Sequence, residues 1–400
     1  MAQVAAADGD KISIRQWLPL AGLTLSAFIF NTSEFMPIGL LTDIGGTFSL
    51  SEAQTGIMIS VYAWAVMILS LPLMVAASRV EFKRLLLGVI AVFAFGQFLS
   101  AVAPTYLVLV LARLVVASAH AVFWSIASIM ATRLVSPKHG SLAVSMIATG
   151  TAVAQIFGLP IGRAIGLLVG WRMTFGCVGV IAVLVIVYQS AVFPPMPAGK
   201  PFTLRQLPDL LKNPLLMGMY LVTFLFASSY YTGYSYIEPF LAQIGGFAPD
   251  LITVALTIFG VAGLLGSVVF TRFYDGRHVP FIAGAILANT AALLLLRVAA
   301  AGLPEVIVAF IMWGMGATVF NIAFQAEVIR CTKADESAVA MSIFSGIFNL
   351  GIGCGTAFGG VVVNGAGIAA VGFAGGAIGA VTLACCAALV LRRLGTVAAK

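Results

Sequence analysis

The chain has 400 residues, of which 61% are hydrophobic and only 9% are charged. Soluble domains carry about 25% charged residues, so this composition excludes a water-soluble globular protein and indicates an integral membrane protein. The net charge of +7 would suit a nucleic-acid-binding protein, but the positions of the cations, described below, argue against that class.

A transmembrane helix needs about 20 consecutive apolar residues. Twelve such stretches occur in the chain, which predicts an all-α membrane protein with short loops. In chain order the predicted spans are residues 17–41, 53–76, 85–103, 105–131, 142–165, 173–193, 215–244, 252–273, 280–298, 304–329, 338–363 and 368–391. The first is expected to be a retained span rather than a signal peptide, because no cleavage site of the usual kind follows it.

The chain divides into two similar halves. A proline-rich polar segment, residues 194–213, separates the sixth span from the seventh. Glu34 precedes Pro37 near the end of the first span, and Glu238 precedes Pro239 at the end of the seventh. Such weak internal symmetry predicts two pseudo-symmetric six-helix bundles, 1–193 and 214–400, joined by a cytoplasmic linker, with a site between them near the middle of the membrane.

The lysines and arginines predict the orientation of the chain. With both termini in the cytoplasm, all but four of the 21 cations lie on the cytoplasmic side; the exceptions are Arg163, Arg172 and Arg297 outside and Arg113 within a span. This distribution follows the positive-inside rule, so the basicity reflects topology and no nucleic-acid partner is expected. The spacing of the five cysteines indicates neither disulfides nor a metal site, and no cofactor is predicted.

Three ionisable residues lie inside apolar spans. Glu34 and Arg113 are each about two turns from the predicted outer end of their spans, and His120 follows Arg113 by two turns on the same helix face. Charges at such depth are costly and usually mark a transport path, so we predict that Glu34 pairs with Arg113 and that Glu34, Arg113 and His120 couple transport to protons. The alternatives are a structural ion pair and a simply hydrogen-bonded histidine.

The seventh span ends with a polar stripe. Tyr230, Tyr234 and Glu238 follow one another at intervals of four residues, which places two phenols and a carboxylate on one helix face. We predict that the tyrosines line a cavity and that Glu238 joins the proton-coupling residues. The alternative is an interfacial aromatic belt.

Polar and aromatic residues near the span centres are candidates for substrate binding. Amides donate and accept hydrogen bonds, and aromatic faces suit a sugar ring, so together they would fit an uncharged polyhydroxylated solute. Amides also hold membrane helices together without binding any ligand. The candidates are Asn31, Gln155, Asn321, Gln325 and Asn349, with Tyr62, Trp124 and Phe348 as stacking residues.

Glycines cluster in the fifth and eleventh spans. Small residues let helices approach closely and slide, so Gly150, Gly158 and Gly162, with Pro160 between them, are predicted to be packing and gating elements.

Several segments together resemble the major facilitator superfamily, and more narrowly its sugar efflux transporters of the SotB type, within the twelve-span drug:proton antiporters. They are FNTSEFMPIGLL around Glu34, ARLVVASAHAVFWS around Arg113, ATGTAVAQIFGLPIGR around Pro160, YSYIEPF around Glu238 and FSGIFNLGIG around Asn349. The family's proton-coupling arginine falls on Arg113, and its glycine-proline signature falls on the fifth span.

One family signature departs from its pattern. After the second span the superfamily has an aspartate and arginine, where this chain has Ser78, Arg79 and Glu81. We therefore expect Arg79 and Glu81 to serve the inner gate, with Glu81 as a substitute for the missing aspartate in its contact to the eleventh span.

The resemblance implies a monomeric, multi-pass protein of the bacterial inner membrane that exports small neutral sugars such as arabinose, and sugar analogues, in exchange for protons. Its expected partners are the small-molecule substrate, protons and membrane lipid. Two alternatives stay open: a multidrug/proton antiporter for amphiphilic or cationic compounds, and a membrane-embedded lipid-linked glycosyltransferase. Scattered loop carboxylates make the second, an enzyme, the less favoured interpretation.

Overall fold

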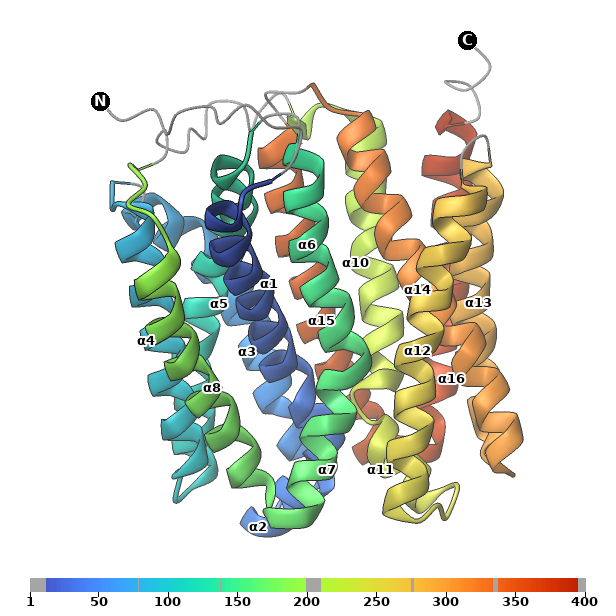
Figure 1. The fold of residues 1–400 in the computed structure, drawn as a ribbon. Helices are drawn as coiled ribbons and strands as arrows, with labels where there is room; N and C mark the ends of the chain where they lie inside the picture. The colour runs from blue at the N-terminus through green and yellow to red at the C-terminus, as the bar shows by residue number, and fades with distance from the viewer. Residues whose placement is uncertain are drawn as a thin grey trace.

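The computed structural model describes residues 12–77, 79–136, 139–198, 210–274, 277–333 and 337–394. In this part of the chain, long helices run side by side and alternate in direction (Figure 1). The elements of the first half are α1 (Ile14–Phe35), η1 (Met36–Leu40), α2 (Leu41–Phe48), α3 (Glu52–Ala77), α4 (Phe82–Ala101), α5 (Tyr106–Leu134), α6 (Gly140–Val153), η3 (Ala154–Gly158), α7 (Leu159–Val169) and α8 (Trp171–Val192). Those of the second are α10 (Pro214–Tyr234), α11 (Ile237–Gln243), α12 (Pro249–Phe273), α13 (His278–Ala299), α14 (Leu303–Arg330), α15 (Ser337–Ala366), η5 (Ile368–Ala370), α16 (Val371–Cys386) and η6 (Ala387–Leu391).

Each of the twelve predicted spans corresponds to one of these helices or to a consecutive series of them, which confirms the predicted fold class. Eleven are long and apolar enough to cross a membrane by themselves. The remaining span, α1, is more polar because it carries Asn31, Ser33 and Glu34. We count it as a span because it packs beside α6 and α8. We call the face that bears α2 and α11 the outer face, following the predicted orientation (Figure 1).

Prolines break two spans near the outer face. Pro37 has no N–H to offer the carbonyl of Ser33 four residues earlier, and α1 gives way to the 3-10 turn η1 at this point. Pro239 stands in the same relation to Ser235, and α10 ends at Tyr234 before α11 begins. The breaks free backbone carbonyls inside the membrane, where they need other partners.

The fifth span packs closely on the first. A Cβ atom at Gly150 would lie 2.4 Å from the Thr24 carbonyl oxygen, and one at Gly158 would lie 2.8 Å from Thr32 Oγ1. Gly162 meets Met36 in the same way, at 2.7 Å. The span is also irregular, because η3 is a π-helical turn immediately before Pro160. This close approach fits the predicted packing role of these glycines.

Helices of the two halves pack on one another at several places, and two of these contacts are close. α3 packs along α15, where Trp64 lies against Gly353, and α12 packs on η3 and α7, where Gly260 lies against Ile156. The division into bundles that move as separate bodies stays a prediction, and residues 199–209 of the predicted linker lie outside the described residues.

Candidate functional site

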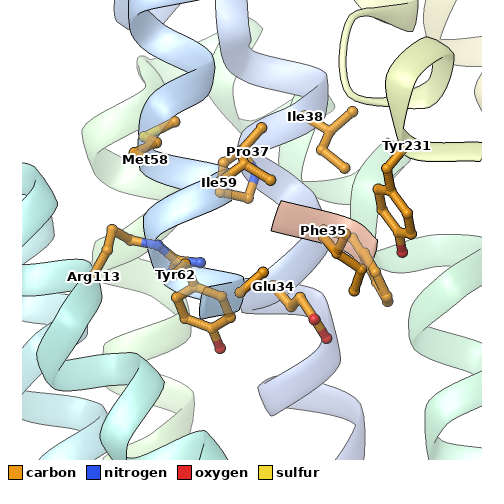
Figure 2. A pocket seen from close by; sticks show the side chains of 11 residues that line it. Glu34, Phe35, Pro37, Ile38, Met58, Ile59, Tyr62, Arg113 and Tyr231 are labelled. Carbon is orange, nitrogen blue, oxygen red and sulfur yellow. The ribbon is translucent and has the colours of Figure 1, made fainter. Parts of the chain in front are cut away.

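A narrow cavity lies where the two halves meet below the outer face (Figure 2). Residues of α1, η1, α3 and α5 line it from the first half, and α10 and α15 contribute one residue each. The lining residues are Glu34, Phe35, Pro37, Ile38, Met58, Ile59, Tyr62, Ala63, Arg113, Tyr231 and Ile352. The room inside is about that of one water molecule. The structure thus brings Glu34, Arg113 and Tyr62 of the predicted site into one cavity.

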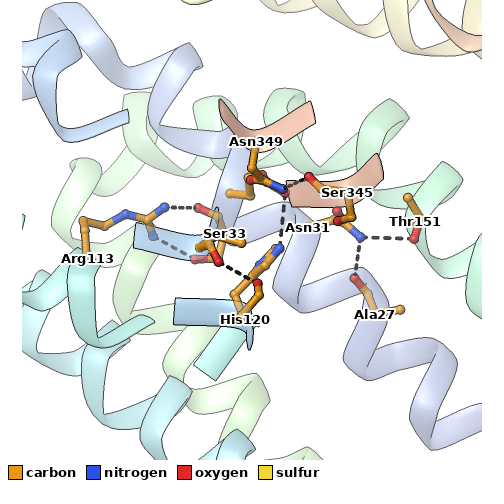
Figure 3. Close-up of polar contacts among 11 residues, drawn as sticks. Ala27, Asn31, Ser33, Arg113, His120, Thr151, Ser345 and Asn349 are labelled. Carbon is orange, nitrogen blue, oxygen red and sulfur yellow. Dashed lines mark hydrogen bonds and ion pairs between the residues drawn. The ribbon is translucent and has the colours of Figure 1, made fainter. Parts of the chain in front are cut away.

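Arg113 binds Ser33 rather than Glu34. Its Nη1 donates to Ser33 Oγ and its Nη2 to the Ser33 carbonyl oxygen, both at 2.9 Å (Figure 3). That carbonyl is the one that Pro37 leaves without a helical donor. The guanidinium carbon also lies 4.3 Å from the centre of the Tyr62 ring, a cation–π contact. Among the described residues no ion pair joins Arg113 to Glu34, so the predicted direct pair is wrong.

Glu34 faces His120 instead. Its Oε2 lies 3.8 Å from His120 Nε2, and the two side chains are 11% and 4% exposed. The Tyr62 ring lies edge-on to the imidazole at 5.6 Å between centres, and Trp124 lies at 6.0 Å. His120 Nδ1 is buried without a hydrogen-bond partner in the described part of the chain. A buried carboxylate beside an imidazole is suited to take up and release a proton.

Three polar residues of this region were not among the predicted site residues. Ser33 anchors Arg113, Gln97 Nε2 donates to Ser33 Oγ at 2.5 Å, and Tyr231 lines the cavity from α10. Gln97 had a usable signal, because it is an amide inside an otherwise apolar span. Tyr231 had none that set it apart from the tyrosines around it.

The predicted amides have different surroundings. The Asn31 Nδ2 donates to the Ala27 carbonyl and to Thr151 Oγ1, and so joins α1 to α6. Asn321 and Gln325 are hydrogen-bonded to each other on α14. Asn349 donates to the Ser345 carbonyl at 3.0 Å, while its buried Oδ1 has no partner among the described residues. The Gln155 side chain lies outside the described residues.

The tyrosine stripe of the seventh span does not continue to Glu238, because α10 ends at Tyr234. The ring centres of Tyr230 and Tyr234 lie 4.8 Å apart, in an aromatic cluster with Trp313 and Phe259. Neither lines the cavity; the neighbouring Tyr231 does, and Phe348 packs on it at 6.4 Å. The seventh span does contribute a tyrosine to the cavity, as predicted, but that tyrosine is Tyr231 and not Tyr230 or Tyr234.

Glu238 forms a buried ion pair across the two halves. Its Oε1 lies 2.9 Å from Arg163 Nη1, with both side chains 3% exposed, and its Oε2 accepts from Thr42 Oγ1 at 2.7 Å. Arg163 also donates to the Gly39 carbonyl. Arg163, which the sequence placed in the outer medium, is therefore buried in α7. Glu238 is not part of the Glu34 cavity lining; its contacts join α11 of the second half to α7 and α2 of the first.

Glu81 caps the start of α4 rather than reaching the eleventh span. Its carboxylate accepts from the backbone N–H groups of Lys83, Arg84 and Met196 at 2.7–3.2 Å, while Arg79 is exposed. Burial opposes its ionisation, but the backbone donors and the Arg84 guanidinium outweigh burial and lower the pKa of Glu81. The predicted substitution for the missing aspartate is therefore wrong, because these oxygens are already engaged by the start of α4 and by Met196.

This capping contact predicts a pH dependence. Because the pKa of Glu81 is lower in the folded protein than its ordinary 4.5, the contact stabilises the fold above pH 4.5 and is lost as pH falls through the lowered value. Glu81→Gln is expected to lower the thermal midpoint of the purified protein near neutral pH, and the gap to wild type should close under acid. An unchanging gap between about pH 6 and pH 3 would contradict this assignment.

Long helices in two similar halves, a cavity between the halves and ionisable groups inside it are typical of a secondary transporter. The model of the Major Facilitator Superfamily matches residues 23–246 and 219–399. Probable sugar efflux transporters of Helicobacter pylori (strain G27) and Helicobacter acinonychis (strain Sheeba) are each 42% identical over 360 residues, 90% of this chain and 92% of theirs. The chain belongs to the major facilitator superfamily; it is a multi-pass membrane transporter and not an enzyme.

Solved structures show the same fold at low identity. A variant of the nucleoside transporter NupG matches with a TM-score of 0.78 and 15% identity, covering 94% of this chain and 99% of that one. A bacterial homologue of the human lysosomal transporter Spinster, inward-facing and unoccupied, matches with a TM-score of 0.75 and 17% identity, covering 95% and 96%.

Proposed function

We propose that the protein exports small neutral sugars such as arabinose, and sugar analogues, across the bacterial inner membrane in exchange for protons. The sugar efflux relatives support the substrate class. The observation that carries the proposal is the Glu34–His120 contact beside the fixed cation Arg113, all three at the boundary of the two halves. Titratable groups at this boundary support the coupling of solute movement to protons.

The surroundings of the cavity suit a neutral polar solute. Tyr62 and Tyr231 line it from opposite halves, and Asn349 Oδ1, which has no partner in the described part of the chain, offers a hydrogen-bond acceptor on α15. The cavity is too small for a sugar as it stands, so binding requires the helices to separate. Rocking of the two halves would provide this, with the Arg163–Glu238 pair breaking whenever the outer face opens.

The proton acts through Glu34. As a carboxylate, Glu34 partly balances the charge of Arg113; once neutral, it leaves the Arg113 charge to Ser33 and Tyr62 alone. This change redistributes the inward-open and outward-open states only if the two bind protons with different affinity. One proton moving inward releases about 2.3 kcal/mol per 100 mV, enough for roughly a 50-fold gradient of a neutral solute.

A counterflow panel tests the substrate class. Purified protein in liposomes loaded with pentoses, hexoses, nucleosides or cationic dyes is expected to accelerate uptake of labelled arabinose only when a sugar is inside. A lipophilic cation should not compete. If the cation competes and arabinose does not exchange, the protein is a multidrug antiporter and the proposal fails.

A further inference from the structure

Ser33 Oγ receives two hydrogen bonds from different helices. Arg113 Nη1 of α5 donates to it at 2.9 Å, and Gln97 Nε2 of α4 donates at 2.5 Å. Ser33 and Gln97 are fully buried, so neither bond competes with water. Gln97 Oε1 has no partner among the described residues, which leaves Ser33 as the one side chain bonded to this amide there.

We propose that Gln97 is a positioning residue for proton coupling: by holding Ser33, it keeps Arg113 on Ser33 and away from Glu34. This inference rests on the proposed function. Arg113 and Glu34 line the same cavity, so a guanidinium released from Ser33 can approach the Glu34 carboxylate there. Gln97 touches neither the proton nor the substrate and acts through Ser33 and Arg113 alone.

The contact sets the pH at which Glu34 takes up its proton. The charged or titratable groups around Glu34 are His120 and Arg113 of α5, Tyr62 of α3 and Tyr231 of α10. Of these, Arg113 carries the permanent charge, and a cation closer to a carboxylate favours the ionised form. Releasing Arg113 from Ser33 would therefore make Glu34 harder to protonate.

The test compares Gln97→Leu with Gln189→Leu. Gln189 is a matched control: it is also fully buried, and among the described residues its Oε1 has no partner and its amide donates only to the Pro19 carbonyl, away from Arg113. The readout is the pH profile of sugar-driven proton flux in liposomes, with the thermal midpoint as a measure of folding. We expect Gln97→Leu to move the midpoint of the profile by about one pH unit toward acid, and Gln189→Leu to leave it in place.

Ser33→Ala provides a second route, because it removes the shared oxygen without adding volume and should shift the profile in the same direction. The inference is overturned if Gln97→Leu and Ser33→Ala keep the wild-type profile, if they shift it toward alkaline pH, or if Gln189→Leu shifts it equally. Should Gln97→Leu not fold, the Ser33→Ala profile decides. Wild-type protein whose flux carries no protons would instead refute the proposed function itself.

Discussion

Glu34→Gln is expected to abolish proton-driven sugar accumulation while leaving sugar exchange across the membrane intact. The amide keeps the size of Glu34 but cannot bind and release a proton beside His120. The sustained solute gradient should therefore fall from roughly 50-fold per 100 mV to about one. Labelled-sugar transport in liposomes with an imposed pH gradient measures the first activity, and counterflow without a gradient measures the second.

An exposed carboxylate provides the control for this experiment. Glu305→Gln alters a residue at the outer start of α14, outside the cavity lining, and should leave both activities unchanged. Arg113→Ala is expected to lose accumulation as well, because Ser33 and Glu34 lose the fixed cation between the halves. Wild-type accumulation by both Glu34→Gln and Arg113→Ala would reject coupling through this cavity.

Glu238→Gln is expected to shift the protein toward states that are open at the outer face. The variant leaves the Arg163 guanidinium buried without a counter-charge, which costs about 3–5 kcal/mol for a pair of this burial. Opening the outer face lets water reach Arg163 and relieves this cost. Spin labels at Gly46 and Gly365, two outer positions with open space around them, should report longer distances than in the parent protein.

Two comparisons identify the cause of this shift. Gln243→Ala removes an exposed hydrogen bond to Glu52 that also joins the halves, and its effect should be small because exposed polar contacts contribute less than about 1 kcal/mol. The double variant Arg163→Met with Glu238→Leu leaves no buried charge and should return the distances toward those of the parent. Equal distances in Glu238→Gln and the parent would show that the ion pair does not hold the outer face.

The helices could be predicted from the sequence because each span depends on a local property, a run of about 20 apolar residues. The partners of the buried charges could not. Arg163 and Glu238 lie in different halves, and only the way the halves meet brings them within 2.9 Å. The tyrosine prediction failed for a related reason, since the regular spacing assumes an unbroken helix and α10 ends at Tyr234.

The sequence predicted several residues of the site but not which of them contact one another. Arg113 and His120 share a face of α5, as their spacing predicted, and the packing of α1 and α3 brings Glu34 and Tyr62 to that face. The sequence suggested a carboxylate as the partner of Arg113, since opposite charges attract. Arg113 instead donates to Ser33, including its carbonyl oxygen. The sequence did indicate a free carbonyl there, because Pro37, four residues after Ser33, has no N–H to donate to it.

Pro37 also suggests why the break between α1 and η1 is useful to the protein. A residue with an N–H at position 37 could donate a helical hydrogen bond to the Ser33 carbonyl and make α1 more regular, but that donor would compete with Arg113 for this oxygen. At this turn, a regular helical hydrogen bond and the Arg113 contact would use the same acceptor, the Ser33 carbonyl oxygen. Selection for thermal stability alone is therefore expected to replace Pro37 and to weaken the contact between Arg113 and the Ser33 carbonyl.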